Sequence, residues 1–235
     1  MKKGGGFYWG YLICLGLLVG LILLLQGVEP SLAEKLTREN GLVEDLTVVG
    51  YGIALVLMAV LLRGLKHYFW FLLLVLAMAL RELDFHARFT SMTTTSTRFY
   101  VSPEVPVVEK IIALVVFFLL LYGLIRLAIS YLPALVAGLK NGRPEAVGVF
   151  LGFLLAVTAK LLDGLSRKLA DFGIDLSAGG SLIAECVEEV LELGIPVMFI
   201  LAVLAAAKSL TPVKTAVPEE QGRSGSAPSC AGRRD

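Results

Sequence analysis

Residues 182–207 read LIAECVEEVLELGIPVMFILAVLAAA, a run that is apolar apart from four glutamates in its first half. A helix needs about 20 mainly apolar residues to cross a bilayer core of about 30 Å, so this run predicts a transmembrane helix. The whole 235-residue chain has the same character, since 57% of it is hydrophobic and 17% is charged. Soluble domains have about 45–50% apolar and about 25% charged residues. The sequence therefore predicts an all-α, polytopic membrane protein.

Six segments of the chain are long and apolar enough to span a bilayer. They cover roughly residues 7–26, 46–62, 68–89, 111–131, 146–164 and 182–207. Together they predict a transmembrane helical bundle over residues 1–210. Residues 211–235 are rich in Pro, Ser, Gly and charge and have few large apolar side chains. We therefore expect this segment to be a disordered cytoplasmic tail.

Basic residues are found at the same side of successive spans. They are Lys2 and Lys3, Arg63 and Lys66, Lys140 and Arg143, and Lys208 and Lys214. By the positive-inside tendency this side is cytoplasmic, which predicts two cytoplasmic termini in a bacterial-type inner membrane. An alternative for the first span is a signal peptide, because Ser31-Leu32-Ala33 resembles a cleavage site. Its apolar stretch is longer than the usual 7 to 15 residues, which favours a retained span.

Ionisable residues of four spans fall at one level near the extracytoplasmic ends of this topology. They are Glu44 and Asp45 at the second span, Arg81, Glu82, Asp84 and His86 in the third, Lys160 and Asp163 in the fifth, and Glu185, Glu188, Glu189 and Glu192 in the sixth. The last four are spaced i, i+3, i+4 and i+7, so they share one helical face. Carboxylates at this spacing repel one another and are costly inside a membrane. We therefore expect basic residues, a cation, protons or water to offset them.

One hypothesis is a cation-dependent enzyme embedded in the membrane. Carboxylates together with an imidazole suit zinc, manganese or iron, and the candidate metal ligands are Glu82, His86, Asp163, Glu185, Glu188, Glu189 and Glu192. The candidate catalytic residues are Glu82, Asp84 and Glu189, with Arg81 and Lys160 as candidate substrate-binding residues. Such a site would activate water for attack on a lipid or another amphipathic substrate. The chain lacks the Glu-x-x-His pairs of dinuclear carboxylate bundles, so the hypothesis depends on the cluster alone.

Two other classes of function fit the same residues. In a proton- or cation-coupled transporter of small solutes, the acids would exchange protons or cations while Arg81 or Lys160 held an anion. Pro196 follows the glutamate stripe and would kink the sixth span. In an accessory or structural subunit, the charges would form an ion-pair network.

Composition narrows the partners and the chemistry further. The formal net charge of +1 predicts no nucleic-acid partner, and the lipid bilayer is the partner that the apolar spans imply. Cys14, Cys186 and Cys230 are too scattered for a disulfide framework, and we interpret them as unpaired thiols.

Overall fold

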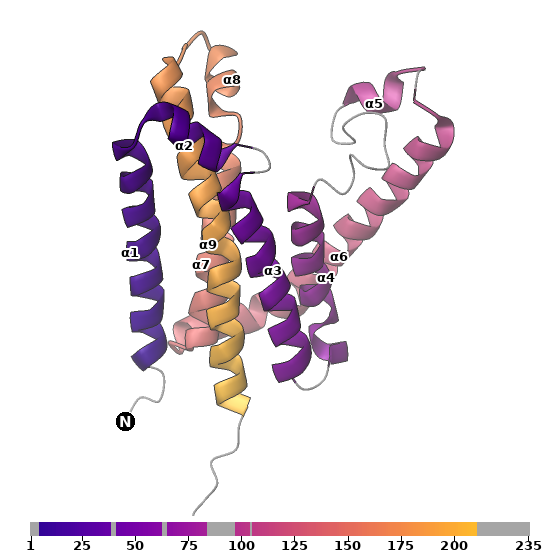
Figure 1. The fold of residues 1–235 in the computed structure, drawn as a ribbon. Helices are drawn as coiled ribbons and strands as arrows, with labels where there is room; N and C mark the ends of the chain where they lie inside the picture. Colours follow the sequence, from indigo (N-terminus) through magenta and orange to yellow (C-terminus); the bar gives the residue numbers. More distant parts are fainter. Residues whose placement is uncertain (1–4, 39–40, 63–64, 84–96, 104, 211–235) are drawn as a thin grey trace, which may run out of the picture.

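The structure is a computed structural model that describes residues 5–38, 41–62, 65–83, 97–103 and 105–210 (Figure 1). These residues form helices and no strands. The helices are α1 (Gly5–Gly27), α2 (Pro30–Thr37), α3 (Leu42–Leu61), α4 (Leu65–Glu82), α5 (Thr97–Val101), α6 (Val107–Lys140), α7 (Pro144–Leu162), α8 (Leu165–Ala170) and α9 (Ala178–Leu210). The all-α prediction is confirmed for this part of the chain.

Five segments of the described chain are helical, long and apolar enough to cross a membrane. They are α1, the segment Pro30–Leu61 that contains α3, and α6, α7 and α9. Each overlaps one of the expected spans. Helix α6 presents a nearly continuous apolar surface, with Phe117 and Phe118 more than half exposed. A surface of this kind is stable against lipid and costly in water, so the structure supports a multi-pass membrane protein.

The expected span at residues 68–89 is not among these five segments. Helix α4 ends at Glu82, and its 18 residues include the charged Lys66, Arg81 and Glu82. Residues 84–89 lie outside the described residues. The count of six spans therefore stays a prediction.

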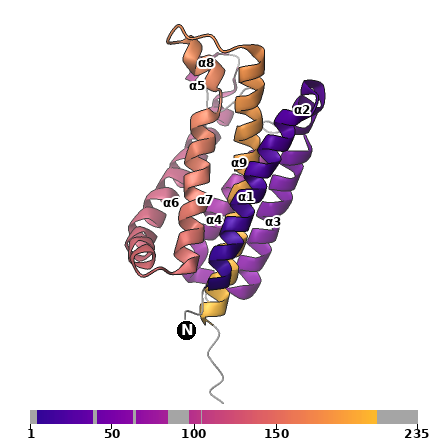
Figure 2. The same ribbon diagram turned by 90° about the vertical axis from the view of Figure 1, so that its left-hand side faces the viewer.

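Both terminal segments of the bundle lie at the same end of the molecule. Figures 1 and 2 show the start of α1 and the last turn of α9 at one end, which we call the terminal end. Helices α2 and α8 lie at the opposite end, which we call the loop end. This arrangement agrees with an even number of crossings between the termini. That the terminal end is cytoplasmic stays a prediction, and the expected tail at 211–235 lies outside the described residues.

Helix α9 is the central element of the bundle. It packs against α1, α2, α3 and α7, and its own residues form much of the core. Small residues on its neighbours permit close approach, as is common between membrane helices. A Cβ atom added to Gly152 of α7 would lie 2.6 Å from the Phe199 ring, and one added to Gly50 of α3 would lie 3.0 Å from Pro196 Cγ. Glutamates on α9 are thus carried into the middle of the bundle.

Two details of the loop end lie outside the expected spans. Helix α2 follows α1 in the chain, and Thr37 Oγ1 at its end lies 3.6 Å from Cys186 Sγ of α9. Ser177 caps the start of α9, because its hydroxyl oxygen accepts a hydrogen bond of 3.2 Å from the Gly180 N–H. Gly179 and Gly180 therefore lie in the first turn of the helix.

Candidate functional site

Four helices bring charged residues together in the loop half of the bundle. Glu44 and Asp45 occupy the first turn of α3, Arg81 and Glu82 the last turn of α4, Lys160 and Asp163 the end of α7, and Glu185, Glu188, Glu189 and Glu192 the first half of α9. Helices α3 and α9 begin toward the loop end, whereas α4 and α7 end toward it (Figure 1). The starts of one pair and the ends of the other therefore lie together, although they are distant in sequence. This convergence is the one that the topology predicted.

An ion pair between α4 and α9 is at the centre of this group. Arg81 Nη2 donates a hydrogen bond of 2.9 Å to Glu192 Oε1. The Glu192 side chain is 7% exposed, whereas the Arg81 side chain is 53% exposed. Glu192 is the charged residue of the core among the residues that the structure describes. A buried carboxylate requires such a partner, because an isolated charge in a low-dielectric interior is very costly.

Glu192 lies close to the middle of its helix. It is 14 residues from the start of α9, which places it about 21 Å along an axis that rises about 1.5 Å per residue. Figure 1 shows that α4, which supplies Arg81, ends well below the level of α2. The ion pair is therefore recessed from the loop end of the bundle.

A second carboxyl group lies beside the ion pair. Glu82 follows Val75 and Ala79, the buried residues of α4, at helical spacing, so it projects toward the core. It interacts electrostatically with Arg81 and Glu192. Carboxyl groups of two helices, α4 and α9, thus share Arg81 as a counter-charge.

The glutamates of α9 differ in exposure along the helix. Glu185 is exposed, Glu188 and Glu189 are half-buried, and Glu192 is buried. Neighbouring members interact electrostatically, and Glu189 also interacts with Glu44 of α3 and Glu82 of α4. The stripe thus forms a series of carboxyl groups that become more buried from Glu185 to Glu192.

Sequence reasoning missed Tyr51. This residue of α3 is fully buried, and its hydroxyl has no hydrogen-bond partner within the described part of the chain. It interacts electrostatically with Glu82, Glu192 and Arg81. The available signal was its position two helical turns after Glu44, in the middle of a span and away from the aromatic belt at the span ends. A buried hydroxyl beside a charged pair is suited to binding a water molecule or a polar group that joins the site.

Pro196 weakens α9 next to the ion pair. Proline has no N–H, so the backbone carbonyl of Glu192, four residues earlier, lacks its normal helical donor. Helix α9 nevertheless continues through this position, with Gly50 of α3 packed against the ring. The residue that carries the buried carboxylate is therefore also the residue at which the helix is easiest to bend.

Lys160 and Asp163 form a separate pair at the end of α7. The Lys160 ammonium group donates a hydrogen bond to the Asp163 carboxylate, and the two side chains are 67% and 33% exposed. This hydrogen bond holds the pKa of Asp163 below its ordinary value. The structure thus pairs the candidate substrate-binding Lys160 with the candidate metal ligand Asp163, beside the α4–α9 pair rather than within it.

The expected metal ligands are only partly placed. Asp84 and His86 lie outside the described residues. Across the residues that are described, no group of three or more His, Cys, Asp or Glu side chains is arranged to hold a metal ion. Glu185 is exposed, seven residues from Glu192 along the stripe. Metal binding therefore stays a prediction.

Fold and site together define a helical, multi-pass type of membrane protein with an ion-paired acidic site inside its bundle. Comparison of the chain with protein-family models, with curated proteins and with solved structures finds no match.

Proposed function

We propose that this protein is a proton-coupled carrier of an anionic solute. The observation that supports this proposal is the pairing of buried Glu192 with half-exposed Arg81, with a second carboxyl group, Glu82, beside it. In such a site a proton and an anion can together replace the ion pair, because the proton satisfies Glu192 and the anion satisfies Arg81. The half-buried carboxyl groups of Glu188 and Glu189, which precede Glu192 on the same face of α9, supply the protons.

Each residue has a defined role in this cycle. When Glu192 binds a proton it becomes neutral, and the guanidinium group of Arg81 is released to bind an anion. When the proton leaves, Glu192 competes with the anion for Arg81 and expels it. Glu82 holds or shares the proton, and Pro196 allows α9 to change its bend as the pair opens. Coupling follows because the anion is bound firmly only in the protonated state.

A second candidate is the cation-dependent enzyme acting on a lipid or amphipathic substrate. The observation that favours it is the gathering of carboxylates from α3, α4 and α9 around Glu189. Zinc, manganese or iron would there require Asp84 or His86 as a further ligand. Its test is the metal content of the purified protein and of the variants Glu82→Ala, His86→Ala and Glu189→Ala. Metal present in the parent protein and lost from all three variants supports the enzyme, and a metal-free parent protein contradicts it.

The carrier is tested in sealed vesicles. The purified protein is reconstituted with the pH-sensitive dye pyranine inside, and a pH gradient, acidic outside, is imposed. Organic carboxylates, sulfonates and phosphates are then added one at a time. We expect at least one of these anions to speed internal acidification in protein-containing vesicles beyond the rate in empty vesicles. The solute should be recovered chemically unchanged.

The matched control is a pair of variants on one helical face. Glu192→Gln removes the carboxylate that pairs with Arg81 and should abolish the anion-dependent acidification. Glu185→Gln removes an exposed carboxylate of the same stripe and should retain most of it. Acidification that no anion accelerates, or that is equal in wild type and Glu192→Gln, contradicts the proposal.

A further inference from the structure

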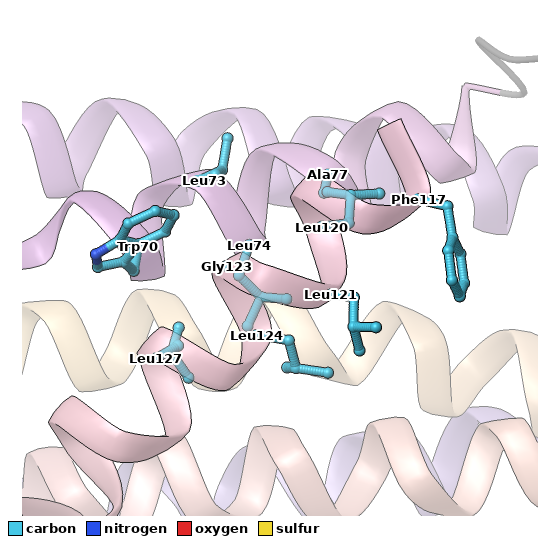
Figure 3. A pocket seen from close by; sticks show the side chains of 10 residues that line it. All are labelled: Trp70, Leu73, Leu74, Ala77, Phe117, Leu120, Leu121, Gly123, Leu124 and Leu127. Carbon is cyan, nitrogen blue, oxygen red and sulfur yellow. The ribbon is translucent and has the colours of Figure 1, made fainter. Parts of the chain in front are cut away.

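An apolar groove runs between α4 and α6. Figure 3 shows side chains of both helices lining it, and its volume is about 340 Å³. On α4 the lining includes Trp70, Leu74 and Ala77, and on α6 it includes Phe117, Leu121 and Leu124. Gly123 belongs to the narrow part, where an added Cβ would lie 3.4 Å from the Trp70 ring. The groove has the chemistry of a site for a hydrocarbon chain.

The groove leads toward the ion pair. Trp70, Leu74, Ala77 and Arg81 follow one another at helical spacings of four, three and four residues, so they share one face of α4. Arg81 is therefore one turn beyond the last α4 residue of the groove. Figure 1 shows α6 leaning away from the bundle toward the end that carries α5.

The length of this path matches one lipid chain. From Trp70 to Arg81 there are 11 residues, or about 16 Å of helix at about 1.5 Å per residue. Half of a bilayer core of about 30 Å is about 15 Å, which is the depth that one leaflet's acyl chain occupies. A lipid whose head lies at Arg81 would thus place its chain along the whole groove.

We infer that this groove binds an anionic lipid, with its acyl chain between α4 and α6 and its anionic head group on Arg81. Arg81 follows the groove on the same face of α4, more than half of its side chain is exposed, and one nitrogen of its several donors is used by Glu192. The inference rests on the proposed function, because it names the class of anion that Arg81 accepts.

Acidic neighbours of Arg81 oppose the binding of an anionic head group. Arg81 interacts electrostatically with Glu192 and Glu188 of α9, Glu82 of its own helix, Asp163 of α7 and Tyr51 of α3, and Lys160 pairs with Asp163. Ionised carboxylates repel an anionic head group. Replacing the Glu192 carboxylate by an amide removes the negative charge that is hydrogen-bonded to Arg81, so Glu192→Gln should strengthen lipid binding.

Trp70 is a built-in reporter for the experiment, since the chain has two tryptophans and Trp9→Phe leaves Trp70 alone in the full-length protein. The variant is placed in phosphatidylcholine vesicles at neutral pH. Three vesicle preparations are compared, each with the same small fraction of one chain-brominated lipid. The brominated lipid is phosphatidic acid, phosphatidylcholine or a cationic trimethylammonium lipid. Bromine quenches nearby tryptophan fluorescence. We expect phosphatidic acid to be enriched about fivefold over phosphatidylcholine at Trp70, the factor that corresponds to about 1 kcal/mol for one basic residue.

Four variants separate the head-group contact from the chain contact. Arg81→Gln should abolish the preference for phosphatidic acid, while Arg126→Gln, on α6 and outside the groove lining, should retain it. Ala77→Phe fills the groove and should lower quenching by all brominated lipids. Glu192→Gln keeps Arg81 and frees it, so it should strengthen the preference for phosphatidic acid and keeps the test decisive even if Arg81→Gln fails to fold.

Equal quenching by the three lipids, a preference for the cationic lipid, or a preference that is unchanged in Arg81→Gln overturns the inference. The outcome is separable from that of the carrier, because no pH gradient or solute movement enters the measurement. Lipid preference without anion-driven acidification refutes the carrier alone. Acidification driven by short anions without lipid preference refutes the lipid site alone.

Discussion

Removing one member of the Arg81–Glu192 pair should destabilise the protein more than removing both. Arg81→Gln leaves the Glu192 carboxylate in the core, 7% exposed and without its counter-charge. Glu192→Gln leaves the arginine charge, which is more than half exposed and is solvated more easily. We therefore expect Arg81→Gln to be the more damaging single substitution and the double variant to recover part of the loss.

The magnitude follows from the geometry of the pair. Unit charges about 4 Å apart interact by about 4 kcal/mol at an effective dielectric constant of about 20. Exposure of half of the Arg81 side chain permits solvent screening, which we take to remove roughly half of this energy. The expected coupling is about 2 kcal/mol, within the range of about 1.5–3 kcal/mol for hydrogen bonds to charged groups.

The assay is a double-mutant cycle on the free energy of unfolding, measured by titrating mixed micelles with SDS. Wild type, Arg81→Gln, Glu192→Gln and the double variant form the test cycle. Lys160→Gln, Asp163→Asn and their double variant form the control cycle, because that pair is much more exposed and should couple by about 0–1 kcal/mol.

Additive effects of Arg81→Gln and Glu192→Gln, within about 0.5 kcal/mol, would refute the reasoning, because independent sites behave in this way. Equal coupling in the two cycles would also refute it, since burial of Glu192 would then make no difference.

Three further substitutions test the packing around the site. Gly152→Ala places a Cβ atom 2.6 Å from the buried Phe199 ring and should lower the unfolding free energy by about 1–3 kcal/mol. Gly16→Ala is the control, because the space around Gly16 is open and the substitution should not lower that free energy. Thermal unfolding in micelles compares the two variants. Ser177→Ala removes the cap of α9 and should cost about 1 kcal/mol in the same assay. Tyr51→Phe deletes a buried hydroxyl without a partner among the described residues, so the unfolding free energy should stay unchanged or rise by up to about 1 kcal/mol. A fall of more than about 1 kcal/mol would instead show that the hydroxyl forms a hydrogen bond in the folded protein.

The sequence predicted the parts of the molecule that depend on hydrophobic length. Five of the expected spans are present as long helices, and α9 extends over residues 178–210 where 182–207 was predicted. Convergence of charges from four helices was also predictable, because a topology that alternates between two sides places the ends of alternate spans together. Helical periodicity placed the four glutamates on one face of α9.

Details that depend on tertiary contacts were not predictable in the same way. The spacing of the glutamates does not say which of them is buried, and it is the packing of α9 against α3 and α7 that buries Glu192 and leaves Glu185 exposed. Helix α2 has 8 residues, which is too short for the apolar run that identifies a membrane span. Its contact with α9 stabilises it, and that contact cannot be read from the sequence. The start of α9 at Ala178, four residues before the predicted span, depends on the Ser177 cap, which no apolar pattern indicates.

The central claim is that an anion and a proton together replace the ion pair between Arg81 and Glu192. Infrared difference spectroscopy of the folded protein measures this directly at constant pH, by following carboxylate and carboxylic acid bands as a transported anion is added. The account predicts a carboxylic acid band that appears reversibly with the anion in wild type, is missing in Glu192→Gln and persists in Glu185→Gln. An anion that binds without any carboxylic acid band, or a band that is unchanged in Glu192→Gln, would contradict it.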